Sequence, residues 1–337
     1  MDFYLHEILD TLSQEHHQPS VLAQITNVEG SSYRKAGAWM LLKEDGSKIG
    51  LISGGCLEND LKHRASELFS TGRAEIVEYD LSSEDDLGWG SGAGCNGIVS
   101  VLLRDVDDRY RRFLKSIKEQ LNKIEPVLFV QSLTNFDQYA FLNKTNETLG
   151  DISFEIPKEF IVLLQTTPRF CHYAKKDMTE NEAFFLQLIW PKPNLYVVGA
   201  GEDVRPFAHL AADMGYSVHI LDWREANCTS EFFPSAQSFF IGEPDQVVKE
   251  IPLSSLDSVI IMTHDFQRDR KILLHLKELQ LFYVGILGSK KRTERLIGGE
   301  IPNWLHSPIG LSIGAEGPKE IAISIAAELI QSRRRKI

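Results

Sequence analysis

The hydrophobic and polar positions between residues 194 and 224 predict one complete β-α-β unit. A short apolar run at 195–198 indicates a buried strand, which leads directly into the turn from Gly199 to Gly201. Apolar residues then recur at helical spacing, and a second apolar run at 218–221 ends in Asp222. A glycine turn at the start of a helix lets backbone N–H groups approach a phosphate, and an acid at this strand tip is placed to hold ribose hydroxyls.

Two further positions bear on what this unit would bind. Arg224 lies beside the acid and would instead meet a 2′-phosphate. Val204 stands where the dinucleotide fingerprint has its third glycine or alanine, so helix and strand would pack less closely than a dinucleotide usually requires. The pattern therefore predicts a Rossmann-type domain and leaves open whether it binds a dinucleotide, another ligand or none.

The alternation of strands and helices continues after this unit. A strongly apolar strand at 257–262 is followed by His264 and Asp265. Doubly wound sheets bind ligands at the carboxyl ends of their strands, so both are candidate site residues, although Asp265 is equally suited to cap the next helix. The following strand leads into Gly288, Ser289 and three cations, a combination that suits a phosphate at a helix start.

In the first half, a loop of small and hydroxyl residues at 30–37 follows a predicted strand at 21–28. Ser31 and Ser32 offer hydroxyl groups, and Arg34 offers a forked cation. Such a loop suits an oxyanion. The alternative is a long hairpin connection with a solvated Arg-Lys pair.

A second glycine turn precedes a helix and carries a thiol. The strand at 48–52, which closes a hairpin, leads into Gly54, Gly55, Cys56 and then Glu58 in the opening of an amphipathic helix. A cysteine at a helix N-terminus feels the positive end of the dipole, which lowers the thiol pKa and favours nucleophilic attack, persulfide carriage or metal ligation. The alternative is a small buried cysteine that fills a tight turn.

A third loop lies between two predicted strands and is unusually rich in glycine. Five glycines fall between residues 88 and 97, together with Cys95, and this composition disfavours a helix or a strand. The segment is either a flexible linker or a second loop that surrounds a ligand. We expect the loops around Arg34, Cys56 and Cys95 to line one pocket.

The rest of the hydrophobic pattern predicts structural helices and strands and one domain boundary. Prolines at 191 and 193 interrupt helix and ladder alike, so we expect domains at 1–190 and 191–337. The first is predicted as a mixed α/β domain and the second as a Rossmann-like doubly wound parallel sheet. The other expected elements are a helix at 110–121, strands at 127–132, 138–142 and 160–165, and a final helix whose buried stripe is Ile321, Ile325, Ala326, Leu329 and Ile330.

Composition narrows the class of protein. The 337 residues carry a formal net charge of −11, which argues against non-specific nucleic-acid binding because phosphate neutralisation needs clustered cations. We expect neither a signal peptide nor a membrane span, since the opening residues include an acid and no apolar run approaches the length needed. The expected location is the cytoplasm. Four scattered cysteines indicate neither a disulfide scaffold nor a structural zinc site.

Taken together, the motifs resemble the XdhC/CoxI family of accessory factors for xanthine dehydrogenase and related molybdenum hydroxylases. The resemblance spans most of the chain in order and is weakest at 105–190. The matching segments are GSSYRKAGAWM at 30–40, GLISGGCLE at 50–58, GAGCNGIVSVLL at 92–103, VVGAG at 197–201, LDWR at 221–224, MTHD at 262–265, GILGSKKR at 285–292 and PIGLSIGAEGPKEIAISIAAEL at 308–329.

The resemblance implies a chaperone that forms dimers and has no turnover of its own. Such a protein binds molybdenum cofactor (molybdopterin), protects it while a cysteine desulfurase installs the terminal sulfur, and passes it to an apo-hydroxylase such as xanthine dehydrogenase. It also implies that Cys56 is the residue that contacts molybdenum or sulfur, with Cys95 second. The chain departs from its relatives at 202–204, where they tend to carry a histidine and then a small residue; two acids there would weaken anion binding.

Two other functions fit part of the sequence. An NAD(P)-dependent oxidoreductase is suggested by Gly199, Gly201 and Asp222, but no acid or base for hydride transfer is evident near them. A regulatory or scaffold protein that binds a nucleotide and the hydroxylase is the third hypothesis. The expected ligands are therefore molybdenum cofactor first, and NAD(P) or another nucleotide second.

Overall fold

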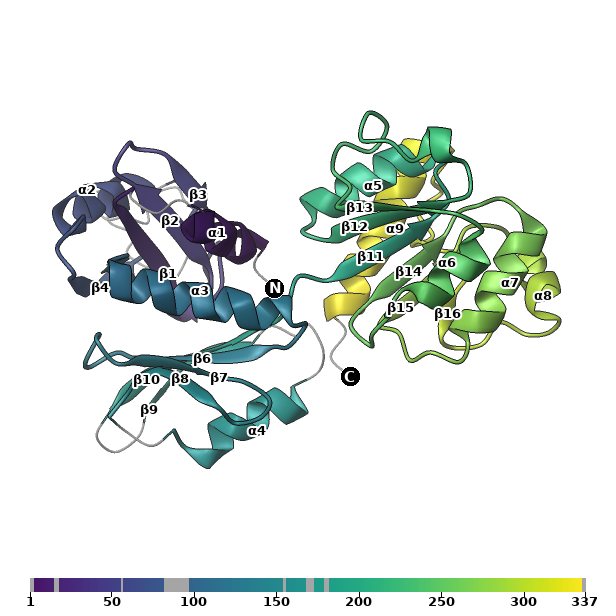
Figure 1. Ribbon diagram of the computed structural model, residues 1–337. Helices are drawn as coiled ribbons and strands as arrows, with labels where there is room; N and C mark the ends of the chain where they lie inside the picture. Colours follow the sequence, from purple (N-terminus) through teal and green to yellow (C-terminus); the bar gives the residue numbers. More distant parts are fainter. Residues whose placement is uncertain are drawn as a thin grey trace. The chain divides into compact units, whose positions relative to one another are not determined.

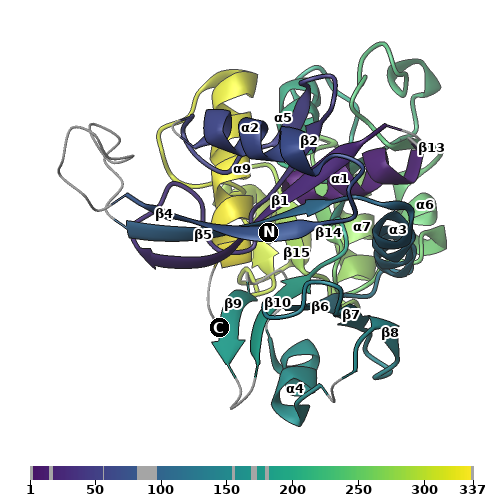
Figure 2. The ribbon, with the colours of Figure 1, turned by 90° about the vertical axis from the view of Figure 1, so that its left-hand side faces the viewer.

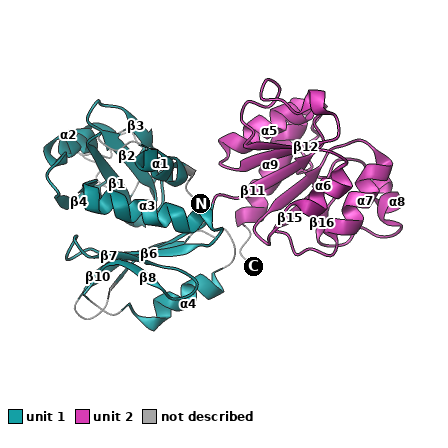
Figure 3. Ribbon diagram, viewed as in Figure 1, with its two compact units in different colours: residues 1–191 teal, residues 192–337 magenta. Residues whose placement is uncertain are grey.

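The chain folds as two compact units, Met1–Pro191 and Lys192–Ile337 (Figures 1 and 3). The structure is a computed structural model that describes residues 3–14, 18–55, 57–81, 97–153, 156–167, 173–178 and 182–334. The change of unit falls between Pro191 and Pro193, where neither proline has a backbone N–H to continue a ladder.

The first unit opens with an antiparallel sheet of five strands in the order β3-β2-β1-β5-β4, called here the first sheet. The hairpin predicted before the strand at 48–52 is confirmed, since a turn at Asp45 and Gly46 joins β2 to β3. Helix α2 (Glu58–Leu68) packs on one face of this sheet through its apolar stripe. The strands are β1 (Ser20–Gly30), β2 (Trp39–Lys43), β3 (Lys48–Gly50), β4 (Ala74–Asp80) and β5 (Gly97–Asp105).

A second antiparallel sheet completes the first unit, in the order β8-β7-β6-β10-β9. Helices α1 (Phe3–Gln14) and α3 (Asp108–Asn122) share one core with the facing sides of both sheets. Helix α4 (Lys158–Thr166) covers the opposite side of the second sheet, so α2 and α4 lie at the two ends of a layered α/β stack (Figures 1 and 2). The strands are β6 (Val127–Ser132), β7 (Tyr139–Leu142), β8 (Thr148–Asp151), β9 (Tyr173–Met178) and β10 (Ala183–Ile189).

One buried glutamine connects the two sheets of the first unit. The side-chain oxygen of Gln187, in β10, accepts hydrogen bonds from Trp39 Nε1 at 2.8 Å and from Gln24 Nε2 at 3.0 Å. Its amide nitrogen donates to the carbonyl oxygen of Gly37 at 2.9 Å. The end of the loop at 30–37 is therefore held by a side chain of the second sheet.

We expect Gln187→Leu to lower the free energy of unfolding of the first unit by about 2 kcal/mol. The substitution would remove the acceptor of two buried N–H donors and the donor to a buried backbone carbonyl, and each hydrogen bond lost in the interior carries a cost. Urea unfolding combined with hydrogen exchange of the amides in β1, β2 and β10 measures this change. Gln14→Leu, at an exposed position of α1, is the matched control, and an equal loss in both variants would contradict the role given to Gln187.

The second unit is a six-stranded parallel sheet in the order β13-β12-β11-β14-β15-β16. Numbered from β11, this is the order 3-2-1-4-5-6 of a doubly wound Rossmann fold, so the prediction is confirmed. The strands are β11 (Asn194–Val198), β12 (Ser217–Asp222), β13 (Ser238–Ile241), β14 (Ser258–Ile261), β15 (Tyr283–Ile286) and β16 (Leu305–His306).

Helices cover both faces of this parallel sheet (Figure 1). Helices α5 (Val204–Asp213) and α9 (Gly317–Arg334) share the core of one face. The other face is covered by α6 (Pro244–Glu250), α7 (Phe266–Leu276) and α8 (Lys290–Ile297). A short 3-10 turn, η1 (Glu225–Asn227), follows β12. The sheet edge at the carboxyl ends of the strands is thus the place where loops can form a site.

The predicted strand at 160–165 is wrong, because these residues lie in α4. Phe160 and Leu164 are buried, and their spacing of four residues puts them on one side of a helix, while Val162 is 47% exposed. A short run of apolar and β-branched residues is compatible with either element. Pro157 precedes the helix and has no backbone N–H, so the hydrogen-bond ladder of a strand could not continue through this position.

The buried stripe of α9 also differs in part from the prediction. Ile325, Ala326 and Leu329 are buried as predicted, but Ile330 is 37% exposed. The buried positions continue through Ala322 and step by three or four residues, so the position next to Leu329 turns away from the core. Within the described ranges, neither α9 nor any other helix combines the length and apolar character that crossing a membrane requires.

Candidate functional site

The loops that follow β11 and β14 lie side by side at the carboxyl edge of the parallel sheet. These two strands are neighbours, with Val198 opposite Ile261. The chain leaves β11 toward β12 on one side and leaves β14 toward β15 on the other, so this pair is the topological switch point where such sheets bind ligands. Gly199 to Gly201 form the first loop, and Thr263 to Asp265 form the second.

Gly199 is required by the neighbouring strand. Its φ is +119°, and a Cβ atom there would lie less than 3.0 Å from the carbonyl oxygen of Met262. Its N–H donates to the carbonyl oxygen of Leu221 at 2.8 Å. The sequence predicts that a phosphate approaches this glycine closely. In the structure the group that approaches Gly199 closely is the backbone of Met262.

Gly201 lies against a carboxylate of its own loop. A Cβ atom there would lie less than 3.0 Å from Asp203 Oδ1, and Asp203 Oδ2 lies 2.7 Å from His264 Nε2. His264 has a φ of 59°, in the left-handed region, and its side chain is 62% exposed. Among the described residues, the Asp203 side chain makes no capping hydrogen bond to α5. This carboxylate therefore links the two loops of the switch point.

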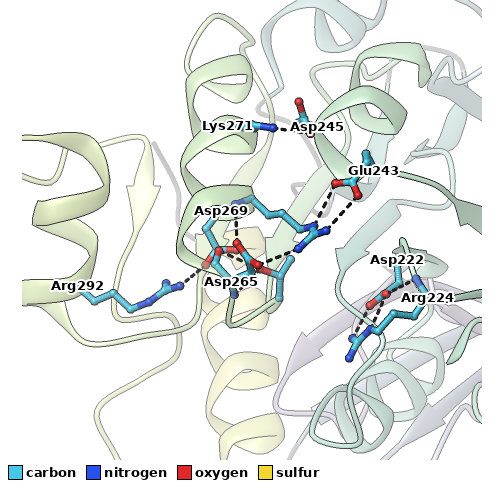
Figure 4. A network of polar contacts seen from close by, with 10 residues as sticks. Asp222, Arg224, Glu243, Asp245, Asp265, Asp269, Lys271 and Arg292 are labelled. Carbon is cyan, nitrogen blue, oxygen red and sulfur yellow. Dashed lines mark hydrogen bonds and ion pairs between the residues drawn. The ribbon is translucent and has the colours of Figure 1, made fainter.

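Asp222, predicted to hold a ribose, is fully buried and is bonded by its own chain (Figure 4). Its Oδ2 accepts from the Ala200 N–H at 2.6 Å and from Arg224 Nη2 at 2.8 Å. Its Oδ1 accepts from the backbone N–H and the Nε of Arg224 at 2.8 and 2.9 Å. Burial alone would raise the pKa of Asp222, but these hydrogen bonds outweigh it and hold the pKa below its usual value. Ribose binding would have to replace them and stays a prediction.

Asp265 caps α7 and takes part in an ion-pair network (Figure 4). Its carboxylate accepts from the backbone N–H of Arg268 at 2.9 Å, which lowers the Asp265 pKa, and from Arg268 Nη1 at 2.8 Å. Arg268 also donates twice to Glu243, at 3.1 Å each. The Trp223 ring lies 4.0 Å from the Arg268 guanidinium carbon and 4.5 Å from that of Arg224. The capping alternative for Asp265 is therefore the one observed.

Gly288 and Ser289 lie at the start of α8, where the sequence predicts a phosphate site. The Ser289 hydroxyl accepts from the Arg292 N–H at 3.3 Å and so caps the helix. Arg292 Nη2 donates to Asp269 at 2.6 Å, and the Thr263 hydroxyl donates to the other oxygen of this carboxylate. Burial raises the Asp269 pKa in spite of both bonds. Arg292, whose side chain lies beside Gly288, therefore neutralises an acid of α7, and phosphate binding here stays a prediction.

Several residues of this edge were missed by the sequence argument. Glu243, Arg268 and Asp269 were not singled out, and Asp203 was expected to weaken anion binding but not to pair with His264. Glu243 lies two residues after the end of β13, so its place near a strand end was a usable signal. Asp269 lies one turn inside α7, and its partner comes from α8, so only the tertiary fold identifies it.

Three loops of the first unit begin or end at the same end of the first sheet. In the antiparallel register Gly30 lies opposite Gly97, and Asp80 lies opposite Ile98. Gly50 ends β3 opposite Met40, at the start of β2, and so belongs to the same end. The segments 31–38 and 81–96 link strands at this end, and the segment 51–57 leads from β3 into α2. They include the predicted site residues Ser31, Ser32, Arg34, Cys56 and Cys95, of which Cys56 and Cys95 lie outside the described residues.

Gly97 brings two of these loops into backbone contact. A Cβ atom there would lie less than 3.0 Å from backbone atoms of Glu29 and Ser31. The segment that contains Cys95 therefore rejoins the sheet directly beside the loop of Ser31, Ser32 and Arg34. This arrangement follows from described residues alone.

The turn before α2 is built from Ser53, Gly54 and Gly55. The Ser53 hydroxyl accepts from the Gly55 N–H at 3.0 Å and from the Leu57 N–H at 3.3 Å. No described atom lies within 4 Å of the place that a Cβ would take at either glycine. Helix α2 also begins without a side-chain cap among the described residues. As far as the described residues show, the turn thus leaves space beside helix N–H groups that can still bind a ligand.

Glu58, the first residue of α2, carries a buried oxygen without a donor. The side chain is 10% exposed, and one oxygen pairs with Lys48 Nζ. Its other oxygen, Oε1, is buried and has no hydrogen-bond partner in the described part of the chain. A buried acceptor of this kind is costly unless a donor reaches it. The described residues contain no group of three or more His, Cys, Asp or Glu side chains arranged to hold a metal ion.

Family models cover both units of the chain. The model described as "XdhC Rossmann domain" matches residues 195–329, and the model described as "XdhC and CoxI family" matches residues 13–80. Between them, the model described as "BH1974-like, central domain" matches residues 108–190. This last segment contains the second sheet, where the motif resemblance was weakest.

Curated proteins and a solved structure resemble the chain along most of its length. A probable xanthine dehydrogenase subunit of Bacillus subtilis (strain 168) is 42% identical over 331 residues, which is 98% of each chain. The molybdenum cofactor insertion chaperone PaoD of Escherichia coli (strain K12) is 24% identical over 93% of this chain and 83% of its own. The crystal structure of a xanthine dehydrogenase (BH1974) from Bacillus halodurans has a TM-score of 0.86 and 42% identity, covering 98% of this chain and 96% of its own. The chain belongs to the XdhC and CoxI family.

Proposed function

We propose that this protein is a maturation factor for a molybdenum hydroxylase such as xanthine dehydrogenase. It binds the molybdenum cofactor, protects it while the terminal sulfur is installed, and inserts it into the apo-enzyme. The observation that carries this proposal is the similarity, along 93% of the chain, to a protein named as a molybdenum cofactor insertion chaperone. Its partners would be the hydroxylase and a cysteine desulfurase, and it would act as a cytoplasmic homodimer.

The turn before α2 fits the cofactor. When bound, the cofactor supplies an anionic phosphate and a molybdenum atom held by a dithiolene. Cys56 would offer a thiolate to the metal or the sulfur, because a helix N-terminus favours the ionised thiol. The open space beside Gly54 and Gly55 admits a ligand, and the unpaired Glu58 Oε1 would accept a hydrogen bond from it. The neighbouring loop of Ser31, Ser32 and Arg34 would bind the phosphate.

An NAD(P)-dependent oxidoreductase is the alternative, and the strand order of the second unit favours it. Both oxygens of Asp222, however, already accept hydrogen bonds from Arg224 and Ala200. A ribose held by the Asp222 carboxylate at this strand tip would have to replace some of these hydrogen bonds. Calorimetric titration with NADH and NADPH tests this alternative directly.

The proposed function is tested by the pterin content of the purified protein. Produced in a host that makes molybdenum cofactor, the wild-type protein should release fluorescent pterin on oxidative denaturation, approaching one per chain. Cys56→Ser should lower this content at least tenfold, and the loaded protein should activate apo-hydroxylase.

Cys228→Ser is the matched control. Cys228 is a buried thiol of the second unit, and burial raises its pKa to about 11, so it supplies no thiolate near neutral pH. Its substitution should leave the pterin content unchanged. A wild-type protein that carried no pterin and activated no apo-hydroxylase would end the proposal.

A further inference from the structure

Asp203 occupies the part of the second unit where a Rossmann fold usually receives a pyrophosphate. In that fold the second glycine of the turn lacks a side chain so that the pyrophosphate can approach the backbone. Here the second glycine is Gly201, and the group that lies against it is the Asp203 carboxylate. The missing side chain at Gly201 therefore leaves room for the side chain of Asp203 in the same loop.

His264 holds this carboxylate in place. The two side chains come from loops 61 residues apart and meet at 2.7 Å across the switch point. Asp203 is 28% exposed, so the carboxylate is partly withdrawn from water. Its charge there is screened less than that of a fully exposed acid.

Asp222, the acid that would bind the ribose of a dinucleotide, already has hydrogen-bond partners within the protein. Asp222 is fully buried, and its carboxylate accepts hydrogen bonds from Arg224 and from the Ala200 N–H. The Ala200 N–H belongs to the same glycine turn, so a backbone donor of this turn points to a carboxylate of the protein. The pyrophosphate of a dinucleotide would therefore lie against the Asp203 carboxylate. Its ribose would lie against Asp222, which is already hydrogen-bonded to Arg224 and Ala200.

We propose that Asp203 is a specificity-determining residue that excludes dinucleotides from the second unit. Its carboxylate fills the space over Gly201 and places negative charge where a pyrophosphate would add more. The Rossmann fold of this chain thus keeps the strand order of a dinucleotide-binding domain while one side chain closes the phosphate position. This inference goes beyond the maturation role and does not depend on it.

Fluorescence titration of the full-length protein with NADH tests the proposal. The wild-type protein should show no saturable binding up to millimolar NADH. Asp203→Ala, which removes the carboxylate, should bind NADH saturably with a dissociation constant at least tenfold below the highest concentration at which the wild type shows no saturation, equivalent to a gain of at least about 1.4 kcal/mol. Asp203→Asn removes the charge but not the bulk and should show a smaller gain.

Asp213→Ala is the matched control, because Asp213 lies on the same helix α5 and its carboxylate also lies near a histidine, 3.7 Å from His209 Nε2. This variant makes the same change in net charge at the far end of α5 and should bind no better than the wild type. Tight NADH binding by the wild type would overturn the proposal. So would Asp203→Ala and Asp203→Asn variants that are folded, as judged by thermal unfolding, and bind no better than Asp213→Ala.

Discussion

Gly199→Ala should lower the free energy of unfolding of the second unit by about 4 kcal/mol. A Cβ at this position meets the carbonyl oxygen of Met262, which is backbone and cannot move aside without displacing β14. Overpacking of this kind costs a few kcal/mol, and the positive φ of 119° adds strain for any residue with a side chain. Urea unfolding, combined with hydrogen exchange of the amides in β11 and β14, measures the loss.

Two other glycines separate the causes of this effect. Gly298 ends α8 with a φ of 75° and has open space where a Cβ would lie, so Gly298→Ala should cost only about 1 kcal/mol of backbone strain. Gly201→Ala meets the flexible end of Asp203 and should be tolerated at similarly small cost. If Gly199→Ala were no more destabilising than Gly298→Ala, the contact with Met262 would not explain this glycine.

The two glycines of the first turn also show what the sequence can predict. The order of strand, turn, helix and strand was evident from hydrophobic spacing, and the Rossmann fold followed from it. The purpose of each glycine was not evident. At Gly199 a side chain would clash with the backbone of Met262, which belongs to a different strand-loop connection, whereas Gly201 borders an acid whose direction depends on His264. Local pattern carries no information about partners so far along the chain.

In the first unit, hydrophobic alternation and the hairpin signal predicted enough strands to bring three loops to one end of a sheet. The sequence predicted strands at 127–132 and 138–142 but did not reveal the second sheet as a separate layer, because the strand at 148–151 is exposed along its whole length and has no hydrophobic alternation. It also did not reveal Gln187, whose three partners all belong to the first sheet or its loop. The sequence likewise identified Glu58 only as an acid near the start of a helix. The structure adds that its Oε1 is buried and has no hydrogen-bond donor among the described residues.

Asp222→Asn should lower the free energy of unfolding of the second unit by about 3 kcal/mol at pH 7. The asparagine keeps the size of the side chain but turns one acceptor oxygen into a donor, which then faces the donors of Arg224 and Ala200. Hydrogen bonds to a buried charged group contribute more than neutral ones, and breaking a buried pair leaves unpaired groups behind. Chemical unfolding at several pH values, monitored in the second unit, measures the effect.

The pH dependence identifies the carboxylate as the source. The pKa of Asp222 is lowered in the folded protein, so its contribution is complete above the ordinary value of 3.8 and is lost as the pH falls through the lower folded value. The difference between wild type and Asp222→Asn should therefore be constant from pH 7 to about pH 5 and shrink below about pH 4. Arg224→Met removes the side-chain donors but keeps the backbone N–H of this position, and because Arg224 is 42% exposed its loss should cost only about 1 kcal/mol. A difference between wild type and Asp222→Asn that stayed unchanged down to pH 2 would show that packing, and not the charge of Asp222, stabilises this end of β12.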